Sequence, residues 1–229
     1  MIPAAEALAR LREGNRRFAE NRIVAPEISH QERRAELTER QEPFAIVLGC
    51  SDSRVPAELI FDQGFGDLFV IRVAGNIVAP SQVGSVEFAA ERYHTRLVVV
   101  MGHSRCGAVI ATVEALLGRE PAGSRNLRSI VERLVPSVEP LLSETRQYDL
   151  LGEDTLIARA VRANVRASVD HLRHGSEILE EMVRKDGLMI VGAEYSLDSG
   201  IVTFLDDAPR RGRSRADVVG AGDDVEDVG

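Results

Sequence analysis

The sequence predicts an α/β fold, with a central, mostly parallel β-sheet of four parallel strands and one antiparallel edge strand. Helices flank this sheet, and a helical arm precedes it at the N-terminus. The first observation is a set of short, continuous apolar runs rich in β-branched residues, which are typical of strands buried on both faces. These runs alternate with segments of helical spacing, and that alternation indicates parallel strand connections. A further apolar run follows the turn signal Asp198-Ser-Gly200 and predicts the antiparallel edge strand.

The expected elements follow from these patterns in chain order. Strands are predicted at residues 44–49, 68–74, 97–102, 188–192 and 201–205. Helices are predicted at residues 4–19, 31–40, 83–93, 105–117 and 127–138, and over residues 154–184 with a break near Gly175. Residues 1–205 therefore form one expected α/β domain, of which residues 1–40 are the helical arm.

The two ends of the chain differ in character. Ala4, Leu8, Leu11 and Phe18 fall on one stripe of the first helix, so this surface helix is expected to dock on something larger. Residues 206–229, in contrast, hold four Arg, seven acidic residues and five Gly or Pro. Such a composition buries little apolar surface, and we expect this tail to be disordered.

Composition excludes several classes of function. The formal net charge is −8 over 229 residues, which argues against a nucleic-acid partner because phosphate binding needs surplus Lys and Arg. Lys185 is the only lysine and Asp follows it, so no phosphate-binding G-x-x-x-x-G-K-[ST] loop exists. No apolar run of about 18 residues spans a membrane, and the first residues lack the pattern of a secretory signal. We therefore expect a cytoplasmic protein whose partners are small molecules or itself.

Chemistry-bearing side chains follow two of the predicted strands. Cys50 and Asp52 come directly after the first strand, and His103 and Cys106 follow the third. Because ligands bind where the carboxyl ends of parallel strands meet, we expect these side chains to converge. Two thiols and an imidazole suit Zn²⁺ better than Mg²⁺ or Ca²⁺. A second interpretation stays open, in which the cysteines are small buried hydrophobes and the histidine is a hydrogen-bonded structural residue.

Four motifs carry a resemblance to a known family. They are Gly49-Cys-Ser-Asp-Ser-Arg54, Arg72-Val-Ala-Gly-Asn76, Gly84-Ser-Val-Glu-Phe88 and Gly102-His-Ser-Arg-Cys-Gly107. In this order they resemble the motif series of β-class carbonic anhydrases. The helices and the edge strand expected around these motifs fit the same fold.

The resemblance implies a zinc enzyme that reversibly hydrates carbon dioxide to bicarbonate and a proton through a zinc-bound hydroxide. It implies that Cys50, His103 and Cys106 bind Zn²⁺. Asp52 either pairs with Arg54 beside the metal or takes the fourth zinc position in a closed state. We expect the open arrangement, with Asp52 held by Arg54, near and above neutral pH.

The resemblance also implies a substrate cleft and an assembly. Gln41, nine residues before Cys50, matches a glutamine that helps to orient carbon dioxide or bicarbonate, and Phe69, Ala74 and Phe88 fall on apolar cleft positions. The family fold implies a homodimer or tetramer whose cleft residues are shared across the interface. Two alternatives stay open: a carbonyl sulfide or carbon disulfide hydrolase on the same scaffold, and a non-catalytic protein of this fold.

Overall fold

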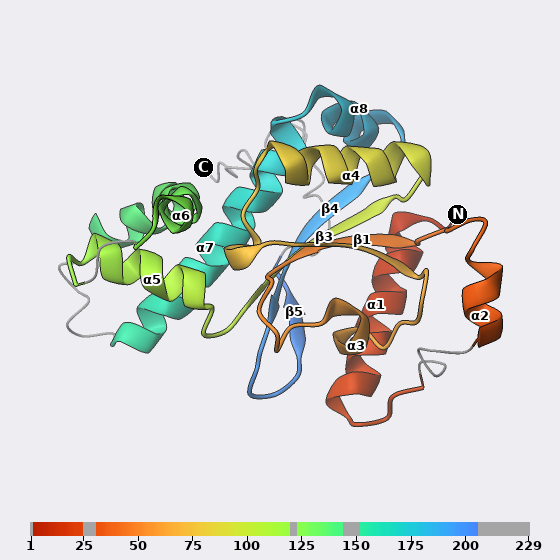
Figure 1. Cartoon of the computed structure of the whole chain (residues 1–229), viewed down its shortest axis with the longest axis horizontal. Helices are drawn as coiled ribbons and strands as arrows, with labels where there is room; N and C mark the ends of the chain where they lie inside the picture. Colours follow the sequence, from red (N-terminus) through yellow and green to blue (C-terminus); the bar gives the residue numbers. More distant parts are fainter. Residues whose placement is uncertain (1, 25–30, 120–122, 144–151, 206–229) are drawn as a thin grey trace, which may run out of the picture.

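A computed structural model describes residues 2–24, 31–119, 123–143 and 152–205 of the chain (Figure 1). Its centre is a five-stranded sheet in the order β2-β1-β3-β4-β5, in which only the β4–β5 pair is antiparallel. The strands are β1 Ala45–Gly49, β2 Leu68–Arg72, β3 Leu97–His103, β4 Met189–Tyr195 and β5 Val202–Phe204. The predicted fold class is confirmed. The tail expected to be disordered, residues 206–229, lies outside the described residues.

The helices agree with the predicted segments in place and differ in length. They are α1 Ala4–Ala19, α2 Gln31–Glu36, α3 Ala57–Ile60, α4 Pro80–Arg92, α5 Gly107–Leu116, α6 Arg125–Ser143, α7 Glu153–His174 and α8 Glu177–Lys185, with a 3₁₀ turn η1 at Ala74–Asn76. Helix α6 continues beyond its predicted end at Val138, and Leu141 and Leu142 of this extension pack against the same core as Leu134 and Val138. The sequence patterns missed α3 and η1, which are too short to show a helical period.

Helices cover both faces of the sheet (Figure 1). On one face, Leu11 of α1 and Ile60 of α3 pack in a core with Val47 and other strand residues. On the other face, α4, α7 and α8 form a second core with the alternate strand residues, among them Val98. Helix α1 therefore docks on the sheet of its own chain, where Leu11 is fully buried.

The direction of the strand connections reverses between β1 and β3. The chain leaves β1 through α3 on one face to reach β2, and then crosses back through α4 on the other face to reach β3. Ligands of open parallel sheets bind at such a reversal, beyond the carboxyl ends of the strands. Helix α7 packs against β3 next to this reversal. Gly102 of β3 permits the close approach of α7, since a Cβ at Gly102 would lie 2.6 Å from the side chain of Val165.

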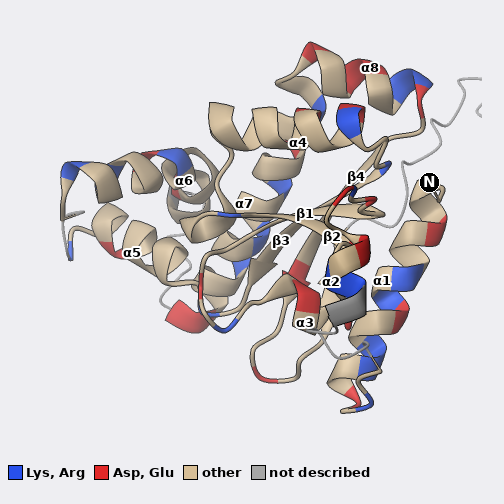
Figure 2. Cartoon of the chain, turned by 45° about the vertical axis from the view of Figure 1, so that its right-hand side comes forward, with Lys and Arg blue, Asp and Glu red and all other residues tan. Residues whose placement is uncertain are grey.

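Both acidic and basic residues occur on α1 and α8 (Figure 2): arginines outnumber acidic residues on α1, and the acidic residues of α8 precede its basic ones. On α1, Arg16 pairs with both Glu13 and Glu20 along one exposed face. Among the described residues, none of the helices is both long and apolar enough to cross a bilayer.

Candidate metal centre

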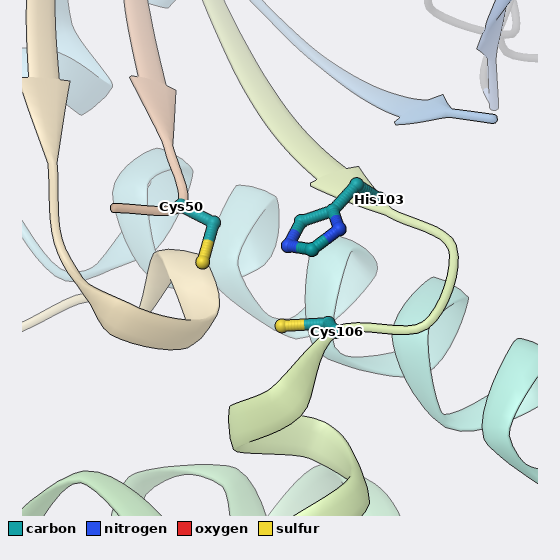
Figure 3. Close-up of side chains that lie close together, drawn as sticks. All are labelled: Cys50, His103 and Cys106. Atoms are coloured by element: carbon teal, nitrogen blue, oxygen red, sulfur yellow. The ribbon is translucent and has the colours of Figure 1, made fainter. Parts of the chain in front are cut away.

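Three side chains able to bind a metal meet at the carboxyl ends of β1 and β3. Cys50 follows β1 directly, His103 is the last residue of β3, and Cys106 immediately precedes α5. Their ligand atoms all lie within 4.8 Å of one another, and all three residues are buried. Figure 3 shows the two sulfur atoms and the imidazole ring facing one common space. The convergence expected from the strand ends is therefore present in the structure.

The two ring nitrogens of His103 have different surroundings. Its Nδ1 lies 3.0 Å from the carbonyl oxygen of Ser104, which accepts a hydrogen bond when Nδ1 carries the proton. Ser104 is itself fixed, because its amide donates to the carbonyl of Tyr195 and its hydroxyl accepts from the amide of Leu197. Nε2 of His103 is buried without a hydrogen-bond partner among the described residues. An unpaired buried nitrogen is costly, and a metal ion bound to it would remove that cost.

The two thiols influence each other. The neighbouring Cys106 lowers the pKa of Cys50, against the opposing effect of burial. Cys50, together with burial, raises the pKa of Cys106. A cation bound between the sulfur atoms would favour the thiolate form of both. Two sulfurs and one nitrogen form a donor set that fits Zn²⁺.

Asp52 and Arg54 form a bidentate ion pair beside these three residues. The guanidinium of Arg54 donates to both carboxylate oxygens, from Nε to Oδ1 at 2.9 Å and from Nη2 to Oδ2 at 2.7 Å. This pairing holds the pKa of Asp52 well below its usual range. Oδ2 of Asp52 lies 3.9 Å from Nε2 of His103, so the carboxylate stands at the edge of the ligand group.

The loop after β1 is held by contacts that the sequence did not reveal. Arg72 donates from Nε to the carbonyl of Cys50 at 2.9 Å and from Nη2 to the carbonyl of Asp52 at 2.5 Å. The amide of Gly75 donates to Sγ of Cys50 at 3.3 Å. The sequence motif Arg72-Val-Ala-Gly-Asn76 marks these residues, but its residue types alone do not predict which atoms of the loop they bind.

The predicted cleft residues do not all lie at this centre. Ala74 does, since it immediately precedes Gly75 in η1. Gln41 comes before β1, whereas Cys50 comes after it, and Phe69 lies near the start of β2. Within one chain, three of the four cleft residues are therefore placed towards the amino ends of the strands.

Gln41, Phe69 and Phe88 belong to a cluster around Tyr93, a residue that the sequence patterns did not single out. Gln41 donates from Nε2 to the hydroxyl of Tyr93 at 2.8 Å. The rings of Phe69 and Phe88 lie 6.3 Å apart, and those of Phe88 and Tyr93 lie 5.6 Å apart. Gln41 and Tyr93 also line a groove of about 1040 Å³.

Comparison with known proteins identifies the family. The carbonic anhydrase family model matches residues 45–202. Carbonic anhydrase 2 of Mycobacterium tuberculosis is 39% identical over 200 residues, which cover 86% of this chain and 90% of that protein. A solved β-carbonic anhydrase, CafA of Aspergillus fumigatus, is similar with a TM-score of 0.69 and 27% identity, over 90% of this chain and 91% of that chain. The chain belongs to the β-carbonic anhydrases.

Membership in the β-carbonic anhydrases confirms the expected enzyme class, a lyase of the carbonic anhydrase type. The carbonic anhydrase of Pseudomonas aeruginosa is a further relative, 37% identical over 183 residues that cover 76% of this chain and 79% of that protein. The described residues contain a sulfur and nitrogen group able to hold a metal, Cys50, His103 and Cys106. The roles of the individual site residues in catalysis stay predictions.

Proposed function

We propose that this β-carbonic anhydrase catalyses the reversible hydration of carbon dioxide to bicarbonate and a proton at a Zn²⁺ ion held by Cys50, His103 and Cys106. The observation that carries the proposal is the convergence of three ligand atoms within 4.8 Å, beside an aspartate already held by an arginine. Buried structural cysteines would not need an unpaired imidazole nitrogen facing them, and Nε2 of His103 is unpaired among the described residues.

The protein side of this site is suited to a cation. When bound, Zn²⁺ would lower the pKa of a coordinated water from about 15.7 to about 7 and so make hydroxide available near neutral pH. Cys50 and Cys106 supply two thiolates, and His103 supplies the lone pair of Nε2 because Nδ1 donates to Ser104. Three protein ligands leave one position for substrate chemistry, as catalytic zinc sites do.

Asp52 and Arg54 orient the nucleophile. An ionised carboxylate can only accept hydrogen bonds, so Asp52 would accept a hydrogen bond from the attacking oxygen and fix which lone pair faces carbon dioxide. Arg54 occupies both carboxylate oxygens, which keeps Asp52 charged and away from the metal. The same pair that lowers the pKa of Asp52 therefore leaves the fourth metal position free.

The substrate cleft is completed by a second copy of the chain. Gln41, Phe69 and Phe88 lie towards the amino ends of the strands, while the three metal ligands lie at the carboxyl ends. A homodimer that sets one edge against the other would bring the apolar rings and the amide of Gln41 to the partner's metal centre. Apolar walls suit carbon dioxide, and the amide would donate to an oxygen of carbon dioxide or bicarbonate.

A reducing compartment suits this chemistry. Cys50 and Cys106 form no disulfide, and their sulfur atoms lie within 4.8 Å of each other. Oxidation would remove two of the three ligands at once, so we place the protein in the cytoplasm, where thiols stay reduced.

Stopped-flow measurement of carbon dioxide hydration by the zinc-loaded protein tests the proposal, with carbonyl sulfide hydrolysis measured on the same sample. We expect rapid hydration of carbon dioxide and a much lower rate with carbonyl sulfide. Zinc-loaded protein that is inert towards carbon dioxide would refute the proposal, and turnover of carbonyl sulfide alone would favour the hydrolase alternative.

A further inference from the structure

A buried polar pair on α7 contacts the turn behind the metal centre. Asn164 is 3% exposed, and its Nδ2 donates to the carbonyl oxygen of Gly75 at 2.8 Å. One turn later on the same helix, the hydroxyl of Ser168 donates to the carbonyl oxygen of Asn76 at 3.4 Å. These two side chains hold successive carbonyls of the segment that also contacts Cys50. The mechanism described above uses neither of them.

The peptide unit between Gly75 and Asn76 is held at both ends. Its carbonyl accepts the hydrogen bond from Asn164, and its amide donates to the carbonyl of Val73 at 3.0 Å. The preceding amide, that of Gly75, donates to Sγ of Cys50 at 3.3 Å. Only the two backbone torsions of Gly75 separate the peptide unit that Asn164 holds from the amide that faces the sulfur.

Gly75 could not hold this geometry by itself. Its φ is +69°, in the left-handed region that favours glycine, and a Cβ there would lie 3.0 Å from the Cβ of Ala108 and 3.2 Å from Leu134. Glycine is required here by space and conformation, and glycine is also the residue whose torsions change most easily. A bond to the neighbouring carbonyl is what restricts them. Without Asn164, that buried carbonyl would lose its donor and the turn could rotate to find another.

We propose that Asn164 is a positioning residue for the metal centre: by holding the carbonyl of Gly75, it aims the amide of Gly75 at the thiolate of Cys50. A hydrogen bond to a metal-bound thiolate fixes the direction of the sulfur and reduces its electron donation to the metal. Asn164 thus acts on the metal through Gly75 and Cys50 without touching either the metal or substrate. The proposal rests on the metal centre of the proposed function.

The test compares Asn164→Ala and Asn164→Val with Ser168→Ala in the full-length chain. Ser168→Ala is the matched control, because it removes a buried hydrogen bond from the same helix to the same turn but leaves the carbonyl of Gly75 paired. Zinc affinity is measured by competition with a chelator. The thiolate-to-metal charge-transfer band is recorded after replacement of zinc by Co²⁺, which reports directly on the sulfur ligands.

We expect both Asn164 variants to raise the zinc dissociation constant about tenfold or more and to shift the charge-transfer band. Ser168→Ala should leave both readouts at the wild-type value, even if its thermal stability falls. Asn164→Val fills more of the vacated space than Asn164→Ala, so it carries the test if the alanine variant does not fold.

Two outcomes would overturn the inference. Asn164 variants with wild-type zinc affinity and an unshifted band would leave Asn164 with a purely structural role. Equal losses in the Asn164 and Ser168 variants would mean that the packing of α7, not the bond to Gly75, supports the site. Failure of the proposed function is a different result, since the wild-type chain itself would then bind no zinc or hydrate no carbon dioxide.

Discussion

The side of the sheet where the parallel strands end, the carboxyl edge, differs from the side where they begin, the amino edge. The difference lies in how much of a functional site one chain builds there. At the carboxyl edge, His103 is 0% exposed, and hydrogen bonds within the chain hold the side chains of Cys50 and His103. At the amino edge, Phe88 is 52% exposed, and Gln41 is also exposed although its amide is bonded to Tyr93. At the carboxyl edge, a single chain brings together the whole group of metal-binding side chains. At the amino edge, apolar rings and the amide of Gln41 face solvent.

This difference separates two kinds of requirement. A metal group needs several ligands at fixed distances, and buried strand ends of one chain supply that rigidity. A cleft for a small apolar substrate needs walls, and exposed rings become walls only when another surface covers them. Loss of a residue at the carboxyl edge should therefore affect metal binding, while loss of a residue at the amino edge should affect turnover with the metal still bound.

The largest effect is expected for Cys106→Ser. A hydroxyl is a poor ligand for Zn²⁺, so the zinc content should fall from about one ion per chain to nearly none, and carbon dioxide hydration should be lost with it. Atomic absorption and stopped-flow assays on the same sample measure both. Ser51→Ala, in the exposed position next to Cys50, is the control and should keep zinc and activity. Full occupancy and turnover in Cys106→Ser would refute the ligand assignment.

Arg54→Ala should come next. With the guanidinium removed, Asp52 is free to occupy the fourth metal position, and we expect kcat/KM to fall about 10- to 100-fold near neutral pH while zinc stays bound. Arg105→Ala is the matched control, because Arg105 is another exposed arginine of the site loops, paired with Asp198 at 3.2 Å. An Arg54→Ala enzyme with an unchanged rate would show that the Asp52–Arg54 pair has no catalytic role.

Gln41→Ala tests the amino edge. Loss of one hydrogen bond to substrate should lower kcat/KM about five- to tenfold with no loss of zinc. Thr38→Ala is the control, since Thr38 lines the same groove but its hydroxyl donates to the carbonyl of Arg34 within its own segment. Zinc loss in Gln41→Ala would contradict the separation of the two edges.

Co-expression of Gln41→Ala and Cys106→Ser chains sharpens this test. In a mixed dimer, one site would combine the intact metal ligands of one chain with the intact Gln41 of the other. The mixed sample should therefore be more active than either parent. A mixture with only the average activity of its parents would argue that each chain builds its cleft alone.

The smallest expected effect is on the pH dependence of the free energy of unfolding. The pKa of Asp52 is lowered in the folded state, chiefly by its bonds to Arg54, so this pair stabilises the fold above the unfolded pKa of about 3.9. That contribution is lost as pH falls through the lower folded pKa. Because Arg54 is 53% exposed, screening by solvent keeps this contribution to the free energy of unfolding small.

Urea unfolding of the metal-free wild type and Asp52→Asn measures this contribution, with Asp198→Asn as the exposed control. The difference between wild type and Asp52→Asn should shrink below about pH 4. A difference that grows on acidification would mean that Asp52 is destabilised, not stabilised, by its surroundings.

The sequence predicted the carboxyl edge well because its information is local. Continuous apolar runs mark β1 and β3, and Cys50 and His103 follow from where those runs end. The distance of Gln41 from the metal centre could not be predicted in the same way. Gln41 and Cys50 are close in sequence, but the whole of β1 separates them in space. The contact between Asn164 and Gly75 could not be predicted for another reason. Asn164 lies on α7, far along the chain from Gly75, and only the packing of α7 brings the two residues together.

A crystal structure of the zinc-loaded protein at about pH 8.5, with anomalous scattering recorded at the zinc edge, tests the central claim most directly. We predict one strong anomalous peak among Sγ of Cys50, Nε2 of His103 and Sγ of Cys106, with Asp52 still bonded to Arg54. A peak elsewhere, or a carboxylate of Asp52 bound to the zinc at this pH, would contradict the open metal centre proposed here.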